Sequence, residues 1–238
     1  MKRAKAADPQ HKLPIGPSQL LQIHANLQLD SIKDKQFWAT ITMCFFGLLR
    51  IGNATASHKT DWDQDKILKR SNITLTKKGY IVELTWTKTI QYKERKLQVA
   101  VPYLGEHPLC PTSALMSFWA QADHCKLPEH SPALGYLNFS GHMQVLTQAD
   151  VRLRIATLMD LLGYVSNQYG THSLRRGGAT FLLLSGVPVE VIKSIGDWKS
   201  DCVLKYLTPD IQAKFDSWTK ALSGFSFKKK VMSYHYLP

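Results

Sequence analysis

The stretch from Tyr169 to Val187 combines an apolar helical pattern with three cations at its start. It reads YGTHSLRRGGATFLLLSGV, and the cations are His172, Arg175 and Arg176. The peptide dipoles make a helix N-terminus electropositive, so basic side chains are stabilised at the opposite end. Cations here predict a compensating anion. It is either a bound phosphate, which helix N-termini accept readily, or a buried carboxylate of the protein.

The spacing of these residues adds a second constraint. His172 and Arg175 are three residues apart and share one helix face, whereas Arg176 points roughly a hundred degrees away. Gly177 and Gly178 follow, and each costs up to about 1 kcal/mol relative to alanine inside a helix. Because glycine permits close backbone approach, we expect a bulky group to pack against this helix.

Four further residues stand at the ends of predicted elements. Arg50 ends a helix too apolar for the surface, where a guanidinium either pairs with a buried acid or lines a site. Lys88 ends a strand and leads into a basic hairpin. Trp198 follows a glycine that ends a helix, and Tyr206 lies eight residues further on. Taken singly, each of the last three is read as a packing or solvated residue.

Taken together, these residue types suit phosphoryl transfer without a metal. Arginines bind phosphate oxygens in pairs of hydrogen bonds and stabilise the charge that grows in the transition state. A lysine or histidine can protonate the leaving oxygen, and a tyrosine oxygen can act as the nucleophile.

The elements that must position these groups are mostly helical. Helices are predicted over 16–27, 30–50, 111–122, 147–164, 171–185, 188–196, 199–207 and 209–222, with Ser31 and Asp34 forming a capping box. Between 66 and 102, alternation as in YIVELTWTK and KLQVAVP predicts a three-stranded antiparallel meander. A loop is expected over 127–143. The fold class is therefore mostly α with one small three-stranded antiparallel sheet (α+β).

The charge indicates a polyanionic partner. The formal net charge is +12 at pH 7, and no terminal segment forms a basic amphipathic helix that would favour a membrane surface. Nucleic acid is therefore the favoured partner, and the family resemblance given below implies double-stranded DNA. The expected contacts are Lys69, Arg70, Lys93, Arg95, Lys96 and Arg176. Arg176 could equally be a structural contact.

Other classes lack a starting point in the sequence. No apolar run is long enough for a membrane span, and the N-terminus has no secretory signal. The four cysteines are scattered, which favours reduced thiols. His107, Cys110, His124 and Cys125 fit no regular zinc spacing, and Cys110 is explained by a Cys-Pro helix start. No P-loop or G-x-S-x-G motif occurs.

Several segments resemble the signature motifs of the tyrosine recombinases, the superfamily of phage integrases and Cre-like enzymes. They are GLLRIGNA, WTKT, HSLRRGGAT and GDWKSDCVLKYL, and they occur in the family's order. CFFGLLR, the Cys-Pro pair and the tryptophan at position 198 most resemble recombinases of eukaryotic mobile elements of the DIRS or Crypton type.

The resemblance implies a reaction and a role for each residue. Tyr206 would attack a DNA phosphate to give a 3′-phosphotyrosine, and Arg50 and Arg175 would hold the non-bridging oxygens. Lys88 would protonate the leaving 5′-oxygen. His172 would assist as acid or base, and the Trp198 indole would donate to the phosphate. No cofactor is required.

The resemblance also implies an organisation. It predicts a basic arm over 1–12, a tyrosine-recombinase catalytic domain over 13–222 and a C-terminal tail over 223–238. Self-association on DNA as a dimer or tetramer is expected, and a eukaryotic origin would place the protein in the nucleus.

The sequence departs from the family at three points. Asn53 stands where the family usually has an acid. The Trp198–Tyr206 spacing is one residue shorter than in many bacterial members, and the N-terminal clamp domain is expected to be missing. Two alternatives therefore remain. One is a domesticated DNA-binding module without activity, and the other is a relaxing enzyme of the type IB topoisomerase kind.

Overall fold

The computed structural model describes residues 12–60, 63–87, 90, 95–123 and 126–198. All of them belong to one compact unit. Its helices are α1 (Pro17–Ala25), α2 (Ile32–Phe46), α3 (Pro111–Ala122), α4 (Gln148–Leu161), α5 (Thr171–Leu184) and α6 (Val189–Ile195). The helices expected over 199–222 and the boundary at 222 lie outside the described residues. Among the described helices, none is long and apolar enough to cross a membrane.

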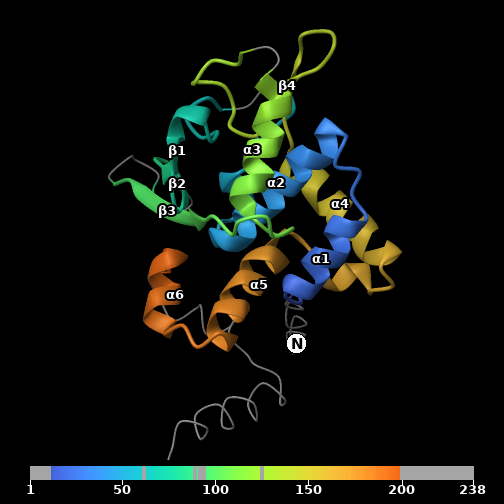
Figure 1. The fold of residues 1–238 in the computed structure, drawn as a ribbon, viewed down its shortest axis with the longest axis vertical. Coiled ribbons are helices and arrows are strands. Elements are labelled where there is room, and N and C mark those ends of the chain that lie inside the picture. The colour runs from blue at the N-terminus through green and yellow to red at the C-terminus, as the bar shows by residue number, and fades with distance from the viewer. Residues whose placement is uncertain (1–11, 61–62, 88–89, 91–94, 124–125, 199–238) are drawn as a thin grey trace, which may run out of the picture. The chain divides into compact units, whose positions relative to one another are not determined.

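Helix α2 is the centre of the hydrophobic core. Every residue from Gln36 to Phe45 is buried, as the apolar sequence of this helix predicts. Figure 1 shows α2 behind α3, with the sheet on one side and α1 and α4 on the other. Glycines allow α5 to approach this core closely. A Cβ on Gly177 would lie 1.7 Å from the Ile15 carbonyl oxygen, and one on Gly178 would lie 2.2 Å from that of Phe45. The bulky group expected against this helix is therefore the protein's own backbone.

The predicted meander is confirmed. Strands β1 (Ile73–Thr76), β2 (Gly79–Leu84) and β3 (Leu97–Pro102) form an antiparallel sheet in that order. Tyr80, Val82 and Leu84 face the core as their alternation predicts, whereas Trp86 lies beyond the end of β2 and is half-buried. The strands leave a long β2–β3 connection, residues 85–96, which is called the hairpin below.

Several local predictions were wrong. Helix α2 ends at Phe46, four residues before Arg50, and Ser31 makes no side-chain capping bond. The Asp34 carboxylate instead accepts hydrogen bonds from the Gln28 N–H, at 2.9 Å, and from Arg154, at 3.0 Å. The loop expected over 127–143 contains part of a second small hairpin, β4 (Tyr136–Leu137) and β5 (Met143–Gln144).

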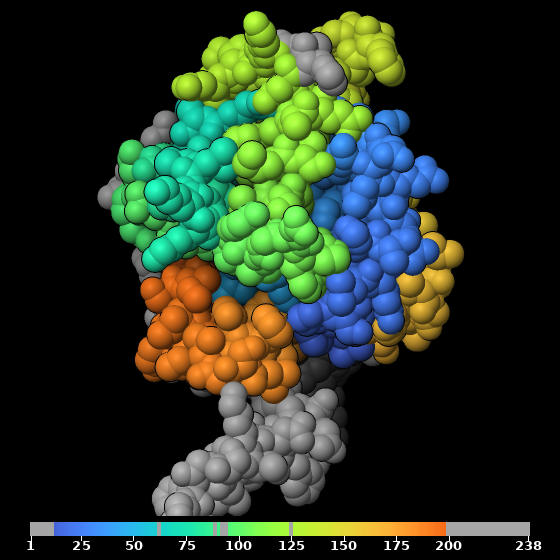
Figure 2. All heavy atoms as spheres, viewed as in Figure 1, coloured from blue at the N-terminus to red at the C-terminus, as the bar shows by residue number. Residues whose placement is uncertain are grey.

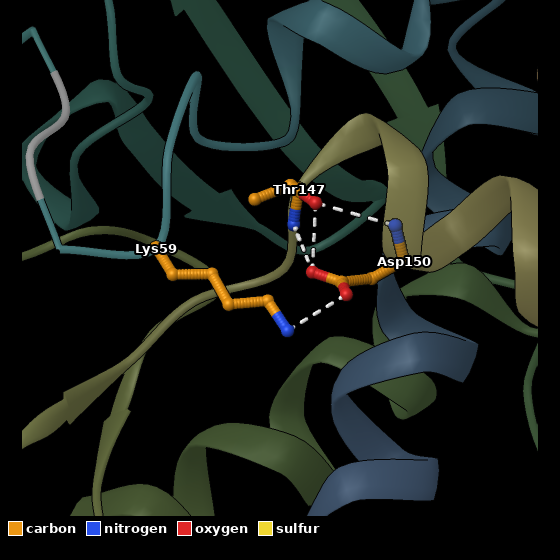
Figure 3. Close-up of polar contacts among 3 residues, drawn as sticks. All are labelled: Lys59, Thr147 and Asp150. Carbon is orange, nitrogen blue, oxygen red and sulfur yellow. Dashed lines mark hydrogen bonds and ion pairs between the residues drawn. The ribbon is translucent and has the colours of Figure 1, made fainter.

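The start of α4 anchors the segment that follows Arg50. Thr147 caps the helix and forms a capping box with Asp150, whose carboxylate binds the Lys59 ammonium at 2.9 Å (Figure 3). Beside this contact, the Ala56 N–H donates to the Leu146 carbonyl at 2.9 Å. These contacts fix residues 56–59 against α4.

Candidate active site

Arg175 is an interior residue although it lies in the first turns of α5. The residue is only 5% exposed. One guanidinium nitrogen, Nη2, donates to the Gly196 carbonyl at 2.6 Å, and the other, Nη1, donates to the Leu48 carbonyl. The guanidinium is therefore held by two backbone oxygens, one of them 127 residues away in the sequence and the other 21 residues away.

Both oxygens lie at helix C-termini that close in the same way. In α2, Gly47 is the C-cap and Leu48 has φ of 47°. In α6, Gly196 is the C-cap and Asp197 has φ of 51°. Both ends show the backbone bonds of a Schellman motif, with a non-glycine residue in the left-handed position that glycine normally takes. These turns aim the two carbonyls at Arg175.

The electrostatics explain why a cation is tolerated in α5. A helix C-terminus carries partial negative charge, and cations are stabilised there. Arg175 thus sits near the positive end of its own helix and against the negative ends of two others. The carbonyl groups at these two helix ends therefore supply part of the negative charge that compensates Arg175. The charge of Arg175 also affects the nearby Cys44 thiol. Burial raises the pKa of this thiol to about 12, and the positive charge of Arg175 lowers the pKa in part.

Trp198 completes this arrangement. The Arg175 Cζ lies 3.9 Å from the centroid of the Trp198 ring, in cation–π contact, and Trp198 is 8% exposed. A Cβ on Gly196 would lie 1.9 Å from a carbon of this ring, so the glycine provides the space that the ring occupies. Trp198 also packs with Leu48, Ala179 and Ile192 in a small cluster of their own.

Arg50 lies two residues beyond the Leu48 carbonyl and differs from Arg175 in exposure. It precedes a short 3-10 helix, η1 (Ile51–Asn53), and is half-buried. Among the residues that the structure describes, its side chain has no hydrogen-bond or ion-pair partner. A half-buried guanidinium of this kind is available to an anion, and it stands close in the chain to the carbonyl that fixes Arg175.

Asn53 connects the Arg50 turn to the hairpin. Its N–H donates to the Arg50 carbonyl at 2.8 Å, and its side-chain amide donates a long hydrogen bond, 3.5 Å, to the Trp86 carbonyl. Asn53 is 7% exposed. A carboxylate in this place could not donate to a carbonyl, so the asparagine that departs from the family pattern suits its surroundings here.

The hairpin is fixed on both sides of residues 88 and 89. Thr87 and Ile90 exchange two backbone hydrogen bonds, of 2.9 and 3.1 Å, and both are buried. Lys88 itself, Lys93 and Tyr206 lie outside the described residues. The structure therefore fixes the chain on either side of Lys88 and describes Trp198, but neither Lys88 nor Tyr206.

His172 is exposed on the first turn of α5, one helical turn before Arg175. The Gly170 N–H donates to the Ser173 hydroxyl at 3.0 Å and supports the start of this helix. The described part of the candidate site is thus Arg50, His172, Arg175 and Trp198. It draws on helix α5 and on the segments that follow α2 and α6.

Five of the six cations expected to contact DNA are among the described residues, and they differ in exposure and in partners. Arg176 is 9% exposed within α5, which favours the structural role. Arg70 pairs with Asp123 and lies over the Trp119 ring, 5.2 Å from its centroid, so it packs against the surface of α3.

The other three described cations lie nearer the surface. Lys69 is half-buried. Lys96 is largely exposed, although it pairs with Glu83, and Arg95 pairs with Asp197.

The described site contains no evident metal-ligand set. Within the described ranges, no three histidine, cysteine, aspartate or glutamate side chains gather as ligands. Cys110, considered above for zinc, is the N-cap of α3, and its sulfur accepts from the Ser113 N–H at 3.4 Å and the Leu104 N–H at 3.2 Å. The chemistry that the described residues offer is the binding of an anion by arginines.

The fold is that of the catalytic domains of tyrosine recombinases and integrases. The solved structure of XerA recombinase matches with a TM-score of 0.62 at 15% identity, over 91% of this chain and 66% of that one. XerH site-specific recombinase bound to difH substrate, in a pre-cleavage complex, matches with a TM-score of 0.60 at 16% identity, over 87% and 54%.

A lambda integrase dimer bound to a COC′ core site matches less closely, with a TM-score of 0.53 at 13% identity, over 87% of this chain and 51% of that one. The chain therefore spans between half and two thirds of the length of these three proteins. No family model and no curated protein matches the sequence.

Proposed function

We propose that the protein is a tyrosine recombinase that cleaves and rejoins DNA strands without a metal ion. The observation that carries the proposal is the pair of arginines. Arg175 is fixed by two helix C-termini and the Trp198 ring. Arg50 follows two residues after Leu48, whose carbonyl binds Arg175, and the Arg50 guanidinium has no hydrogen-bond or ion-pair partner among the described residues. Two such groups suit the two non-bridging oxygens of a phosphodiester.

The proposed reaction balances with the chain's own residues. The Tyr206 oxygen gives its proton to His172, which assists as the base, and attacks phosphorus while the bond from phosphorus to the 5′-oxygen breaks. Lys88 gives a proton to that leaving oxygen. The product is a 3′-phosphotyrosine and a free 5′-hydroxyl, and attack by a 5′-hydroxyl reverses the step. The phosphate ester keeps the bond energy, so no nucleotide is consumed.

The fold and the charge support DNA as the substrate. XerH and lambda integrase were solved on DNA, and the net charge of +12 favours a polyanion. Self-association on DNA is part of the proposal, by analogy with the integrase dimer. The signature segments extend it to a recombinase of a eukaryotic mobile element, acting in the nucleus.

A selection for covalent adducts tests the proposal without knowledge of the target site. The protein is incubated in EDTA with a library of nicked duplexes that carry a randomised core, and protein-linked DNA is recovered under denaturing conditions. The nick releases a short strand, so a cleaved substrate cannot religate. The proposal expects recovered DNA that converges on one sequence. Binding without any covalent product would instead indicate a DNA-binding module.

The variant Arg50→Ala tests whether Arg50 acts in cleavage and not only in DNA binding. Because Arg50 has no structural partner among the described residues, its loss should leave folding and most DNA affinity intact. Cleavage of the selected site should fall by about a hundredfold or more, the scale for the loss of one positioned oxyanion donor. An equal loss of binding and cleavage would make Arg50 an ordinary DNA contact.

A further inference from the structure

The loop that ends α6 meets an arginine at each of three consecutive residues. The Gly196 carbonyl and the Trp198 ring contact Arg175, as described above, and the Asp197 carboxylate between them contacts Arg95. Arg95 Nη2 lies 2.6 Å from Asp197 Oδ2, and the Asp197 side chain is 15% exposed. Asp197 therefore joins the Trp198 loop to the hairpin.

The two partners of this ion pair lie in different parts of the fold. The loop is held twice by Arg175 and closed by the backbone bonds of the α6 terminus. Arg95 stands two residues before β3, in the β2–β3 connection. The space-filling view shows the orange atoms of α6 against the green and teal atoms of the sheet (Figure 2). The ion pair thus docks the hairpin onto an already anchored loop.

The backbone of Asp197 supports a role beyond helix termination. Its φ of 51° lies in the left-handed region, which glycine adopts freely and which aspartate and asparagine tolerate better than most other L-residues. Glycine would serve the turn equally well. The aspartate is explained by its carboxylate, which glycine lacks.

We infer that Arg95 and Asp197 are positioning residues for the proposed reaction. Their ion pair sets the hairpin, in which Thr87 and Ile90 flank the proposed proton donor Lys88, against the loop that carries Trp198. Arg95 is thereby assigned to positioning as well as to the basic surface. This inference rests on the proposed function, and its consequence is specific: loss of the pair should impair protonation of the leaving oxygen.

The test compares two leaving groups on the selected nicked site. One substrate has the natural 5′-oxygen at the scissile phosphate, and the other has sulfur in that position. A thiol has a pKa of about 8.5, so the sulfur leaves without a proton and bypasses a defect in the acid. Asp197→Asn removes the charge but keeps a side chain that tolerates this backbone conformation.

On the oxygen substrate, Asp197→Asn should cleave about tenfold more slowly or worse, with DNA affinity unchanged. On the sulfur substrate its rate should return to that of the wild type, and Lys88→Ala should show the same pattern. Glu83→Gln, which breaks the neighbouring Lys96–Glu83 ion pair of 2.8 Å, should match the wild type on both substrates. Arg95→Gln combined with Asp197→Asn should be no slower than the slower single variant.

Asp197→Gly separates positioning from folding. Glycine keeps the turn but removes the carboxylate, so the variant should stay folded, with a melting temperature close to that of Asp197→Asn, and should show the same defect on the oxygen substrate. Wild-type rates for Asp197→Asn, or a defect that persists equally on sulfur, would overturn the inference alone. An inactive wild type would overturn the proposed function and the inference together.

Discussion

The guanidinium of Arg175 lies over the ring of Trp198, with Cζ 3.9 Å from the ring centroid, while its nitrogens bind the carbonyls of Leu48 and Gly196. This contact joins the ends of three helices, α2, α5 and α6. It makes Arg175 a structural residue as well as a candidate phosphate ligand. Arg50 carries no such structural load, and the two arginines should therefore respond differently to substitution.

The first prediction is a difference in stability between these arginines. Arg175→Ala leaves two buried carbonyls without their donor, and each such loss costs about 1–3 kcal/mol. We expect a loss of about 2–4 kcal/mol in the free energy of unfolding, against less than about 1 kcal/mol for Arg50→Ala. Urea denaturation of both variants measures this difference. Equal losses would contradict the description of Arg175.

Arg175→Lys serves as the conservative control. One ammonium cannot reproduce the planar fork that reaches two carbonyls and covers a ring. The variant should therefore recover only part of the stability that Arg175→Ala loses. Complete recovery would mean that charge alone, without the geometry, holds this part of the fold together.

The second prediction concerns Gly196. A Cβ there would lie 1.9 Å from the Trp198 ring, so Gly196→Ala should displace the ring from Arg175. Overpacking of this kind costs about 1–3 kcal/mol, and cleavage should fall while DNA affinity changes little. Gly52→Ala is the matched control, because a Cβ on the exposed Gly52 would meet no atom within 4 Å. If both variants behaved like the wild type, Trp198 would have no part in the site.

The third prediction uses the net charge. If the charge of +12 serves DNA binding, affinity for duplex DNA should fall steeply with salt, in proportion to the number of phosphates contacted. Filter binding at low and physiological salt measures the slope. Lys77 and Lys78 are both exposed at the β1–β2 turn. Changing either one to glutamine should reduce the slope of log affinity against log salt concentration by about one. A flat response would exclude nucleic acid as the partner.

The sequence predicted the elements of this fold better than their ends. The apolar circumference of 37–49 indicated a central helix, and alternation through Tyr80, Val82 and Leu84 indicated a strand with one buried face. The end of α2 was missed because Leu48 takes a left-handed conformation that its residue type disfavours. Only the tertiary environment, in which its carbonyl meets Arg175, accounts for that turn.

The candidate site was predictable as a set of residues but not as a set of contacts. The position of Arg175 in a helix start signalled an unusual cation, yet one of its partners is a backbone carbonyl 127 residues away. Every residue has a backbone oxygen, so the residue types in the sequence do not indicate which oxygen binds an arginine. The same limit applies to Arg70 and Asp123: an arginine in a basic stretch indicated a DNA contact, and its packing on Trp119 became visible only in three dimensions.

The covalent link between Tyr206 and DNA is the defining intermediate of the proposed reaction. Tyr206 should become linked to a DNA 3′-phosphate in EDTA, without added nucleotide. A free phenol has a pKa of about 10 and is a poor nucleophile at neutral pH, so the arginines and His172 must favour the phenolate and the charged transition state together. After recovery of the adduct from a nicked substrate, proteolysis and mass spectrometry identify the peptide that carries the nucleotide.

We expect one DNA-linked peptide containing Tyr206, no adduct with Tyr206→Phe, and DNA affinity retained in that variant. Tyr103→Phe, at a tyrosine 52% exposed next to β3, should form the adduct normally. An adduct that persists in Tyr206→Phe would mean that another residue is the nucleophile. A wild-type protein that binds DNA but forms no adduct on any sequence in the library would contradict strand cleavage as the function of this protein.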